Sequence, residues 1–280
     1  RCVEETGSYT AANIQVLEGL EAVRRPTVPW ADALRQFLLR VAGDHRVWLP
    51  PSRRHLGRGQ YLPSRRIEAL RIVVGVDSSA DMLAVCRQKA EADGLSPVLY
   101  CQPMQTLDLP KRYACIYVPC GSFTCVIGQE NALEALRRFH RHLLPGGVLA
   151  FNAYFGDWGD YDYNKPEGER AYPSEWKPHV IKEFGGGRRL VVERRWTGVD
   201  PVGQISSEQR RYRLYDGEQL LQEEVHAGQN HWYFKKELLL MLRLAGFADV
   251  QVKGDYTDED FGPQHTGTIV FICRKPDRAG

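Results

Sequence analysis

Apolar and polar positions follow two different patterns along this chain. Four short and mostly apolar runs occupy 72–77, 97–101, 114–120 and 147–155. Two segments between these runs, 81–93 and 131–144, carry apolar residues at helical spacing. A short continuous apolar run is typical of a strand buried on both faces of a parallel sheet. Strands that alternate with amphipathic helices predict an α/β fold with a doubly wound, mostly parallel sheet.

The C-terminal half changes to a period of two. Three segments between 188 and 234 alternate apolar and polar residues, which predicts an antiparallel β layer. A helix is expected at 235–245, ended by Gly246, because glycine commonly closes a helix. The segments 249–257 and 268–275 are expected to form a closing pair of strands.

Composition narrows the class of protein. The chain has 280 residues, of which 43% are apolar and 26% charged, which suits a folded protein rather than a disordered one. The net charge of +2 lacks the concentrated basic field typical of nucleic-acid binding. We see neither an 18-residue apolar run nor a secretory signal at the N-terminus, so we expect a cytoplasmic protein that binds neither membrane nor nucleic acid.

The seven cysteines do not predict a metal site. Their number is odd and no two are spaced as CxxC, so neither a disulfide framework nor a common zinc motif is indicated. Cys115, Cys120 and Cys125 lie in an apolar stretch, where cysteine serves as a small buried hydrophobe.

One acidic residue stands where an α/β sheet binds nucleotides. Asp77 closes the apolar run 72–77, and a carboxylate at the end of such a strand accepts hydrogen bonds from both ribose hydroxyls. The glycine-bearing turn that should precede it is expected about 20 residues upstream, where Gly57 and Gly59 lie. The alternative is an ordinary aspartate at the end of a strand.

From residue 72 to residue 275 the chain resembles the class I S-adenosylmethionine-dependent methyltransferases that modify small molecules. The matching stretches are VVGVDSSADMLAVCRQKA, QPMQTLDLP, YACIYVPCGSFTCV, ALRRFHRHLLPGGVLAFNAY and HWYFKKELLLMLRLAGFADVQVKGDY. The resemblance implies a Rossmann-like, seven-stranded sheet whose last strand, at 268–275, runs antiparallel. It also implies S-adenosylmethionine as the cofactor and a small-molecule acceptor as the partner.

The resemblance assigns roles in cofactor binding to ten residues. Asp77 would hold the ribose, with Ser78 and Met82 around ribose and adenine. Met104 would flank the adenine from the other side. The remaining residues, which would line the methionine part or form the glycine turn, are Pro119, Cys120, Gly121, Ser122, Gly57 and Gly59.

The sequence also departs from the family pattern. The glycine turn lacks its acidic residue and its third glycine, and Pro103 replaces an aspartate that commonly caps the adenine amino group. The expected first strand contains Pro50 and Pro51, which a central strand does not accommodate. Two alternatives follow: a methyltransferase fold with impaired catalysis, or an NAD-dependent oxidoreductase. The latter is disfavoured because the GxGxxG motif is missing.

A second, shorter resemblance covers residues 8–25, which look like the opening helix of the DNA gyrase B subunit family. No ATP-binding glycine motif follows it. We therefore expect residues 1–71 to be atypical for a methyltransferase and hypothesise a fusion or a frameshifted reading there. Resequencing codons 1–75 in the same frame, with strong expression, would contradict that hypothesis.

Methyl transfer needs an aligned acceptor and, for an amine or hydroxyl, a base. The candidate bases are His231 and Tyr233, with His226 and His265 as further histidines, and a structural role is the alternative for each. An aromatic segment after the strand 147–155 could form the acceptor pocket or simply pin a surface loop; its residues are Tyr154, Trp158, Tyr161 and Tyr163.

The paired arginines of the antiparallel layer, at 188–189, 194–195 and 210–211, are expected on solvated strand edges rather than in an anion site. The layer itself could cover the acceptor pocket or form a homodimer surface. The expected domains are an atypical helical segment (1–45), a Rossmann-like cofactor-binding core (46–155), an antiparallel β insertion or acceptor lid (156–234), and the C-terminal helix with the closing strands of the core (235–280).

Overall fold

The structure is a computed structural model that describes residues 47–48, 74–92, 96–119, 121–154, 174–265 and 268–277. The described residues belong to two compact units. One combines the described parts of 47–154 with those of 233–277, and the other comprises 174–232. The segment 8–25, with its resemblance to gyrase B, lies outside the described residues.

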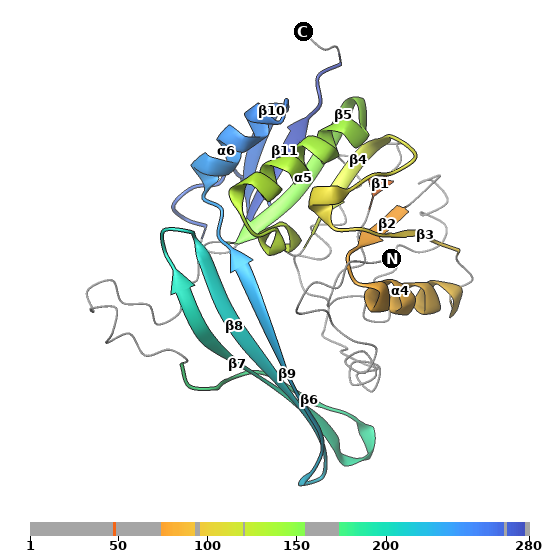
Figure 1. Ribbon diagram of the computed structural model, residues 1–280, viewed down its shortest axis with the longest axis vertical. Coiled ribbons are helices and arrows are strands. Elements are labelled where there is room, and N and C mark those ends of the chain that lie inside the picture. The colour runs from red at the N-terminus through yellow and green to blue at the C-terminus, as the bar shows by residue number, and fades with distance from the viewer. Residues whose placement is uncertain are drawn as a thin grey trace. The chain divides into compact units, whose positions relative to one another are not determined.

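The first unit is built on a seven-stranded sheet. Its strands are β1 (Val47–Trp48), β2 (Val74–Asp77), β3 (Val98–Cys101), β4 (Tyr113–Val118), β5 (Leu143–Tyr154), β10 (Ala248–Gly254) and β11 (Thr268–Arg274), in the order β10-β11-β5-β4-β1-β2-β3. The neighbouring strands β5, β4, β1, β2 and β3 pair in parallel. β11 is antiparallel to both β5 and β10 (Figure 1). The antiparallel last strand is therefore confirmed.

β1 is an interior strand of this sheet despite the prolines that follow it. Trp48 pairs with Val74 of β2 on one side and with Ile116 of β4 on the other. The described strand ends at Trp48, two residues before Pro50. The prolines therefore do not occupy the positions at which β1 makes its described pairs.

Among the described residues, three α-helices accompany the sheet: α4 (Ala80–Ala92), α5 (Gln129–His142) and α6 (Lys235–Leu244). α5 begins and ends two residues earlier than predicted, and β5 begins at Leu143 rather than after Pro145. Leu143 pairs with Tyr113, and the register then shifts before Cys115 pairs with Val148. This irregularity lets the strand include Pro145, which has no N–H to donate to a ladder.

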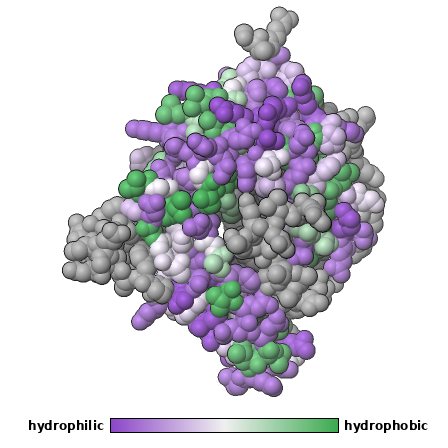
Figure 2. All heavy atoms as spheres, viewed as in Figure 1, coloured by the Kyte–Doolittle hydropathy of each residue, from purple (hydrophilic) through white to green (hydrophobic). Residues whose placement is uncertain are grey.

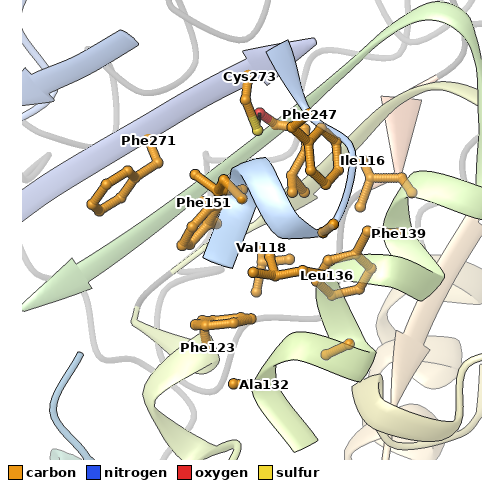
Figure 3. Close-up of a cluster of buried hydrophobic side chains, with 14 of the residues drawn as sticks. Ile116, Val118, Phe123, Ala132, Leu136, Phe139, Phe151, Phe247, Phe271 and Cys273 are labelled. Atoms are coloured by element: carbon orange, nitrogen blue, oxygen red, sulfur yellow. Dashed lines mark hydrogen bonds between the residues drawn. The ribbon is translucent and has the colours of Figure 1, made fainter. Parts of the chain in front are cut away.

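An aromatic column forms the centre of the core. Phe151 on β5 lies between Phe271 on β11 and Phe123, with ring centroids 5.1 and 5.0 Å away. All three side chains are fully buried. Leu136 on α5 and Leu238 on α6 belong to the same cluster, so both helices bury their apolar faces against the sheet (Figure 3).

The second unit contains an antiparallel sheet, as predicted, but the sheet has four strands where the sequence indicated three. Its strands, in spatial order, are β6 (Lys177–Glu183), β7 (Arg188–Asp200), β8 (Ile205–Asp216) and β9 (Gln219–His231). β6 was not among the expected segments, because its sequence KPHVIKE is too polar to show a clear alternation. Leu190, Val192 and Tyr212 form a small buried cluster on this sheet.

The predicted location of the paired arginines is wrong. They lie on β7 and β8, the two central strands, rather than on edges. Two buried glutamates bind three of the paired arginines: Arg211 donates to Glu193 at 2.8 Å, and Arg194 and Arg210 each lie 2.7 Å from Glu208. Arg213 also donates to Glu193, at 2.6 Å. Because each buried carboxylate neutralises neighbouring guanidinium groups, the arrangement is that of internal ion pairing within the sheet.

Of the three cysteines expected to be small buried hydrophobes, Cys115 is buried, whereas the expectation is wrong for Cys125, which is exposed; Cys120 lies outside the described residues. Cys115 and Cys273 are buried, and burial raises the pKa of the Cys115 thiol to about 12, so it stays protonated at neutral pH. Cys101 is disulfide-bonded, and its partner lies outside the described residues. Within the described segments, no group of three or more His, Cys, Asp or Glu side chains could hold a metal ion.

The described surface in view is mostly hydrophilic, with apolar side chains in small groups (Figure 2). No helix in the described part of the chain is both long enough and apolar enough to cross a bilayer.

Substituting the middle ring of the column tests the packing of the core. We expect Phe151→Ala to lower the free energy of unfolding by about 3 to 5 kcal/mol, because it removes a fully buried ring and leaves a cavity between two others. Chemical denaturation followed by circular dichroism measures this. Leu244→Ala, at a position 68% exposed on α6, is the matched control. A loss no larger than that of the control would contradict the packing described here.

Candidate functional site

The parallel strands bring the candidate residues to one edge of the sheet. Because β2, β3, β4 and β5 run in the same direction, the residues at their carboxyl ends lie along the same edge. Asp77 closes β2, Pro119 follows β4 and Tyr154 closes β5. In open α/β sheets, ligands bind outside this edge.

Asp77 is held in a defined orientation. Its Oδ1 accepts a hydrogen bond from the backbone N–H of Ser79 at 2.8 Å. Ser79 in turn accepts one from the N–H of Met82 through its hydroxyl at 3.2 Å, which caps the first turn of α4. Asp77 and Met82 are partly buried and Ser78 is exposed. The strand end therefore presents a fixed carboxylate beside an apolar side chain.

Met104 lies at the same edge, in the short helix η1 (Met104–Thr106) that follows β3. It is partly buried and packs against the core cluster. Gln102 fixes this turn by bonding twice to the backbone of Asp108, at 3.0 and 2.7 Å. Met82 and Met104 thus provide two apolar side chains, one after β2 and one after β3.

A buried histidine ties the loop after η1 to α5. Nε2 of His142 accepts a hydrogen bond from the N–H of Leu109 at 2.9 Å, and Nδ1 lies 2.9 Å from the carbonyl of Arg138. Because a carbonyl oxygen can only accept, Nδ1 is the donor in the second of these bonds. The Arg138 side chain also donates to the carbonyl of Leu107 at 2.9 Å.

The segment after β4 forms a tight turn. Gly121 has φ +68°, the left-handed region that favours glycine. Ser122 donates its hydroxyl to the carbonyl of Pro119 at 2.8 Å, and Thr124 donates to that of Gly121 at 2.7 Å. These bonds start the short helix η2 (Ser122–Cys125). Cys120 lies outside the described residues.

Asn152 is a site residue that sequence reasoning missed. Its Oδ1 accepts the N–H of Gly121 at 3.1 Å, and its side chain is fully buried on β5. Its Nδ2 is buried and has no hydrogen-bond partner within the part of the chain that the structure describes. The one available signal was a lone amide within the apolar run GVLAFNAYF.

The two candidate bases have different surroundings. Tyr233 is buried, packs 5.3 Å from the ring of Phe123, and donates its hydroxyl to the carbonyl of Val126. Burial, and then the charge of Glu237, raises the pKa of this phenol well above its usual range. Tyr233 therefore keeps its proton at neutral pH, which favours a structural role. His231 closes β9 of the insertion sheet, where it is buried opposite Ile205.

The other two histidines are engaged within their own units. The ring of His226 lies 3.1 Å from Glu224, measured between Nε2 and Oε2. His265 accepts the N–H of Gly262 at Nδ1, and its ring stacks on Phe261. Both arrangements favour the structural alternative.

Several predicted residues cannot be placed. Gly57, Gly59, Trp158, Tyr161 and Tyr163 lie outside the described residues. Of the aromatic segment, only the backbone of Tyr154 is described, and it pairs with Thr268 of β11. The predicted acceptor pocket and glycine turn stay predictions.

Comparison with known proteins shows which family the chain resembles. Residues 56–147 match the family model described as a methyltransferase domain, a range that includes Gly57, Gly59, Asp77, Met104 and Gly121. A putative methyltransferase from Geobacillus sp. (strain WCH70) is 28% identical over 209 residues, covering 73% of this chain and 75% of that protein.

Two solved structures share the fold. An S-adenosylmethionine-dependent methyltransferase from Clostridium acetobutylicum superposes with a TM-score of 0.65 at 15% identity, covering 94% of this chain and 97% of the other. The sugar N-methyltransferase KedS8 from Streptoalloteichus sp. gives a TM-score of 0.64 at 17% identity, covering 99% and 96%.

The family match, the sequence relative and the strand order agree with the resemblance seen in the sequence. They leave no support for the alternative of an NAD-dependent oxidoreductase. Residues 56–147 therefore carry a methyltransferase domain, and over most of its length the chain is similar to S-adenosylmethionine-dependent methyltransferases.

Proposed function

We propose that this protein methylates a nitrogen of a small-molecule amine, with an amino sugar as the favoured acceptor. The observation that carries the proposal is the oriented carboxylate of Asp77 at the ligand edge of a methyltransferase sheet. A sugar N-methyltransferase shares the fold over almost the whole chain, which supports a small amine as acceptor.

We further propose that the sheet is doubly wound and that the cofactor lies at its switch point. From the central strand β1, the chain continues to β2 and β3 on one side, and β4 and β5 lie on the other. Right-handed crossovers in opposite directions place α4 and α5 on opposite faces. The crevice then opens at the carboxyl ends of β1 and β4, where open α/β sheets bind ligands.

The residues present at this edge fit S-adenosylmethionine. A carboxylate such as Asp77 accepts hydrogen bonds from both hydroxyls of a ribose, and Ser78 lies beside it. Met82 and Met104 offer apolar faces to an adenine ring. The turn Pro119–Ser122, with Cys120 in it, would run beside the methionine part, and Gly57 and Gly59 would allow close backbone approach upstream.

When bound, this cofactor supplies an electrophilic methyl group on a sulfonium. The protein must align the acceptor nitrogen and exclude water, because alignment rather than covalent help limits such a transfer. We propose that Tyr154, Trp158, Tyr161 and Tyr163 wall the acceptor pocket. We also propose that the insertion 156–234 acts as the lid of this pocket. In the sequence, this insertion follows the core 46–155 and precedes the C-terminal segment 235–280. Homodimer formation stays a prediction.

His231 is the proposed base for the acceptor's proton, and Tyr233 is the less favoured candidate because its phenol keeps its proton. A base positioned for proton transfer contributes about 10²- to 10⁴-fold to a rate. A pH–rate profile of His231→Gln that matched the wild type would contradict this role.

The nature of the acceptor atom is tested with paired acceptors. We expect methyl transfer, measured as S-adenosylhomocysteine formed and as a mass increase of one methyl group, with sugars that carry an amino group. The matched controls are the same sugars with a hydroxyl at that carbon, which should give no product. Methylation of the hydroxyl sugars at the same rate would contradict nitrogen specificity. No product with either set would favour the alternative of impaired catalysis.

The cofactor site is tested at Asp77. We expect Asp77→Ala to weaken binding of S-adenosylhomocysteine by about 10- to 100-fold or more, since it removes two hydrogen bonds to a charged acceptor. Titration calorimetry measures the dissociation constants. Asp108→Ala, whose side chain is 88% exposed, is the control and should bind like the wild type. If Asp77→Ala bound S-adenosylhomocysteine as tightly as the wild type, the proposed position of the ribose beside β2 would be contradicted.

A further inference from the structure

The turn after β4 depends on one side chain from the neighbouring strand. Asn152 lies on β5, and the register of Val118 with Phe151 places it beside the residue that follows β4, Pro119. Its Oδ1 accepts the N–H of Gly121 at 3.1 Å. Gly121 has a left-handed backbone conformation, which turns the chain away from β4. The hydrogen bond to Asn152 holds the backbone of Gly121 in this position.

The other half of the same amide has no hydrogen-bond partner among the described residues. Nδ2 of Asn152 is buried, and the side chain as a whole is fully buried. An amide buried in this way costs free energy unless a partner is supplied. Neighbouring side chains do not relieve the cost: Ser122 and Thr124 direct their hydroxyls to backbone carbonyls within the turn.

Both halves of the amide lie at the segment that would run beside the methionine part of the cofactor. That part carries a carboxylate, whose oxygens accept N–H donors, and charge-assisted hydrogen bonds of this kind are short and strong. We propose that Asn152 is a cofactor-positioning residue: Oδ1 holds the Gly121 turn, while Nδ2 donates to the carboxylate of the cofactor's amino-acid part. This inference rests on the cofactor site proposed above.

The proposal gives Asn152 two functions that a substitution can separate. In Asn152→Asp the side chain still has an oxygen that accepts the N–H of Gly121, so the turn is preserved. The donor, however, is replaced by a second oxygen, and an ionised aspartate repels the carboxylate of the ligand. A group with a purely structural role at the turn would not distinguish ligands that differ only in their amino-acid part.

Two ligands make the separation measurable by calorimetry. S-adenosylhomocysteine carries the amino-acid part, whereas 5′-methylthioadenosine lacks it but keeps the adenosine. We expect Asn152→Asp at neutral pH to weaken binding of S-adenosylhomocysteine by about 10- to 100-fold, as befits a lost hydrogen bond to a charged group. Binding of 5′-methylthioadenosine should change by less than about twofold, within the scatter of substitutions that leave contacts intact.

The pH dependence provides a second readout. A protonated carboxyl group can donate a hydrogen bond, so the affinity of Asn152→Asp for S-adenosylhomocysteine should recover as the pH falls and the aspartate takes up a proton. The wild type has an amide at this position, so the ratio of the two affinities should change with pH. Asn152→Ser, which is too short to bridge both partners, provides a second variant if the aspartate prevents folding. It should also lose more affinity for S-adenosylhomocysteine than for 5′-methylthioadenosine.

Cys273→Ala is the control variant. Cys273 is equally buried on β11 and pairs with Leu149, three residues before Asn152 on β5, so it tests loss of packing away from the turn. It should bind both ligands like the wild type. Equal losses for the two ligands in the Asn152 variants, or no loss for either, would overturn the role of Nδ2 while leaving the cofactor site intact. A wild type that bound neither ligand would overturn both proposals.

Discussion

The packing of Phe151 between Phe123 and Phe271 fixes the relation between β5, β11 and the segment after β4. Burial of three aromatic rings stabilises the sheet against α5 and α6, because aromatic side chains remove more apolar surface from water than most others. The same packing sets the strand register. Since a one-residue slip would turn every apolar side chain to the opposite face, the register decides which residues end each strand.

The polar groups at the carboxyl edge depend on that register. Asp77, the last residue of β2, accepts the N–H of Ser79, whose hydroxyl caps α4. Asn152 on β5 accepts the backbone N–H of Gly121. These are bonds between a rigid sheet and the turns that leave it. A methyltransferase needs such fixed groups, because its main task is to align two reactants rather than to form a covalent intermediate.

Much of the fold could be predicted because the sheet is buried on both faces. Continuous apolar runs gave β2 and β4, and strong helical periodicity gave α5. β6 was not predicted because its polar sequence shows no alternation of apolar and polar residues. The start of β5 was not predicted because a proline such as Pro145 normally ends a strand or helix. Asn152 could not be assigned a role, since its bond to Gly121 joins residues 31 positions apart. The position of the arginines was predicted wrongly for a similar reason: partners such as Glu193 for Arg211 lie on a neighbouring strand, and only the strand pairing brings them together.

The most direct test of the cofactor site is a crystal structure of the protein grown with S-adenosylhomocysteine. We predict the ribose hydroxyls within hydrogen-bond distance of the Asp77 carboxylate, and the adenine ring in contact with Met82 and Met104. A ligand bound at any other edge or face of the sheet, with Asp77 making no contact to the ribose, would contradict the assignment of this edge as the cofactor site.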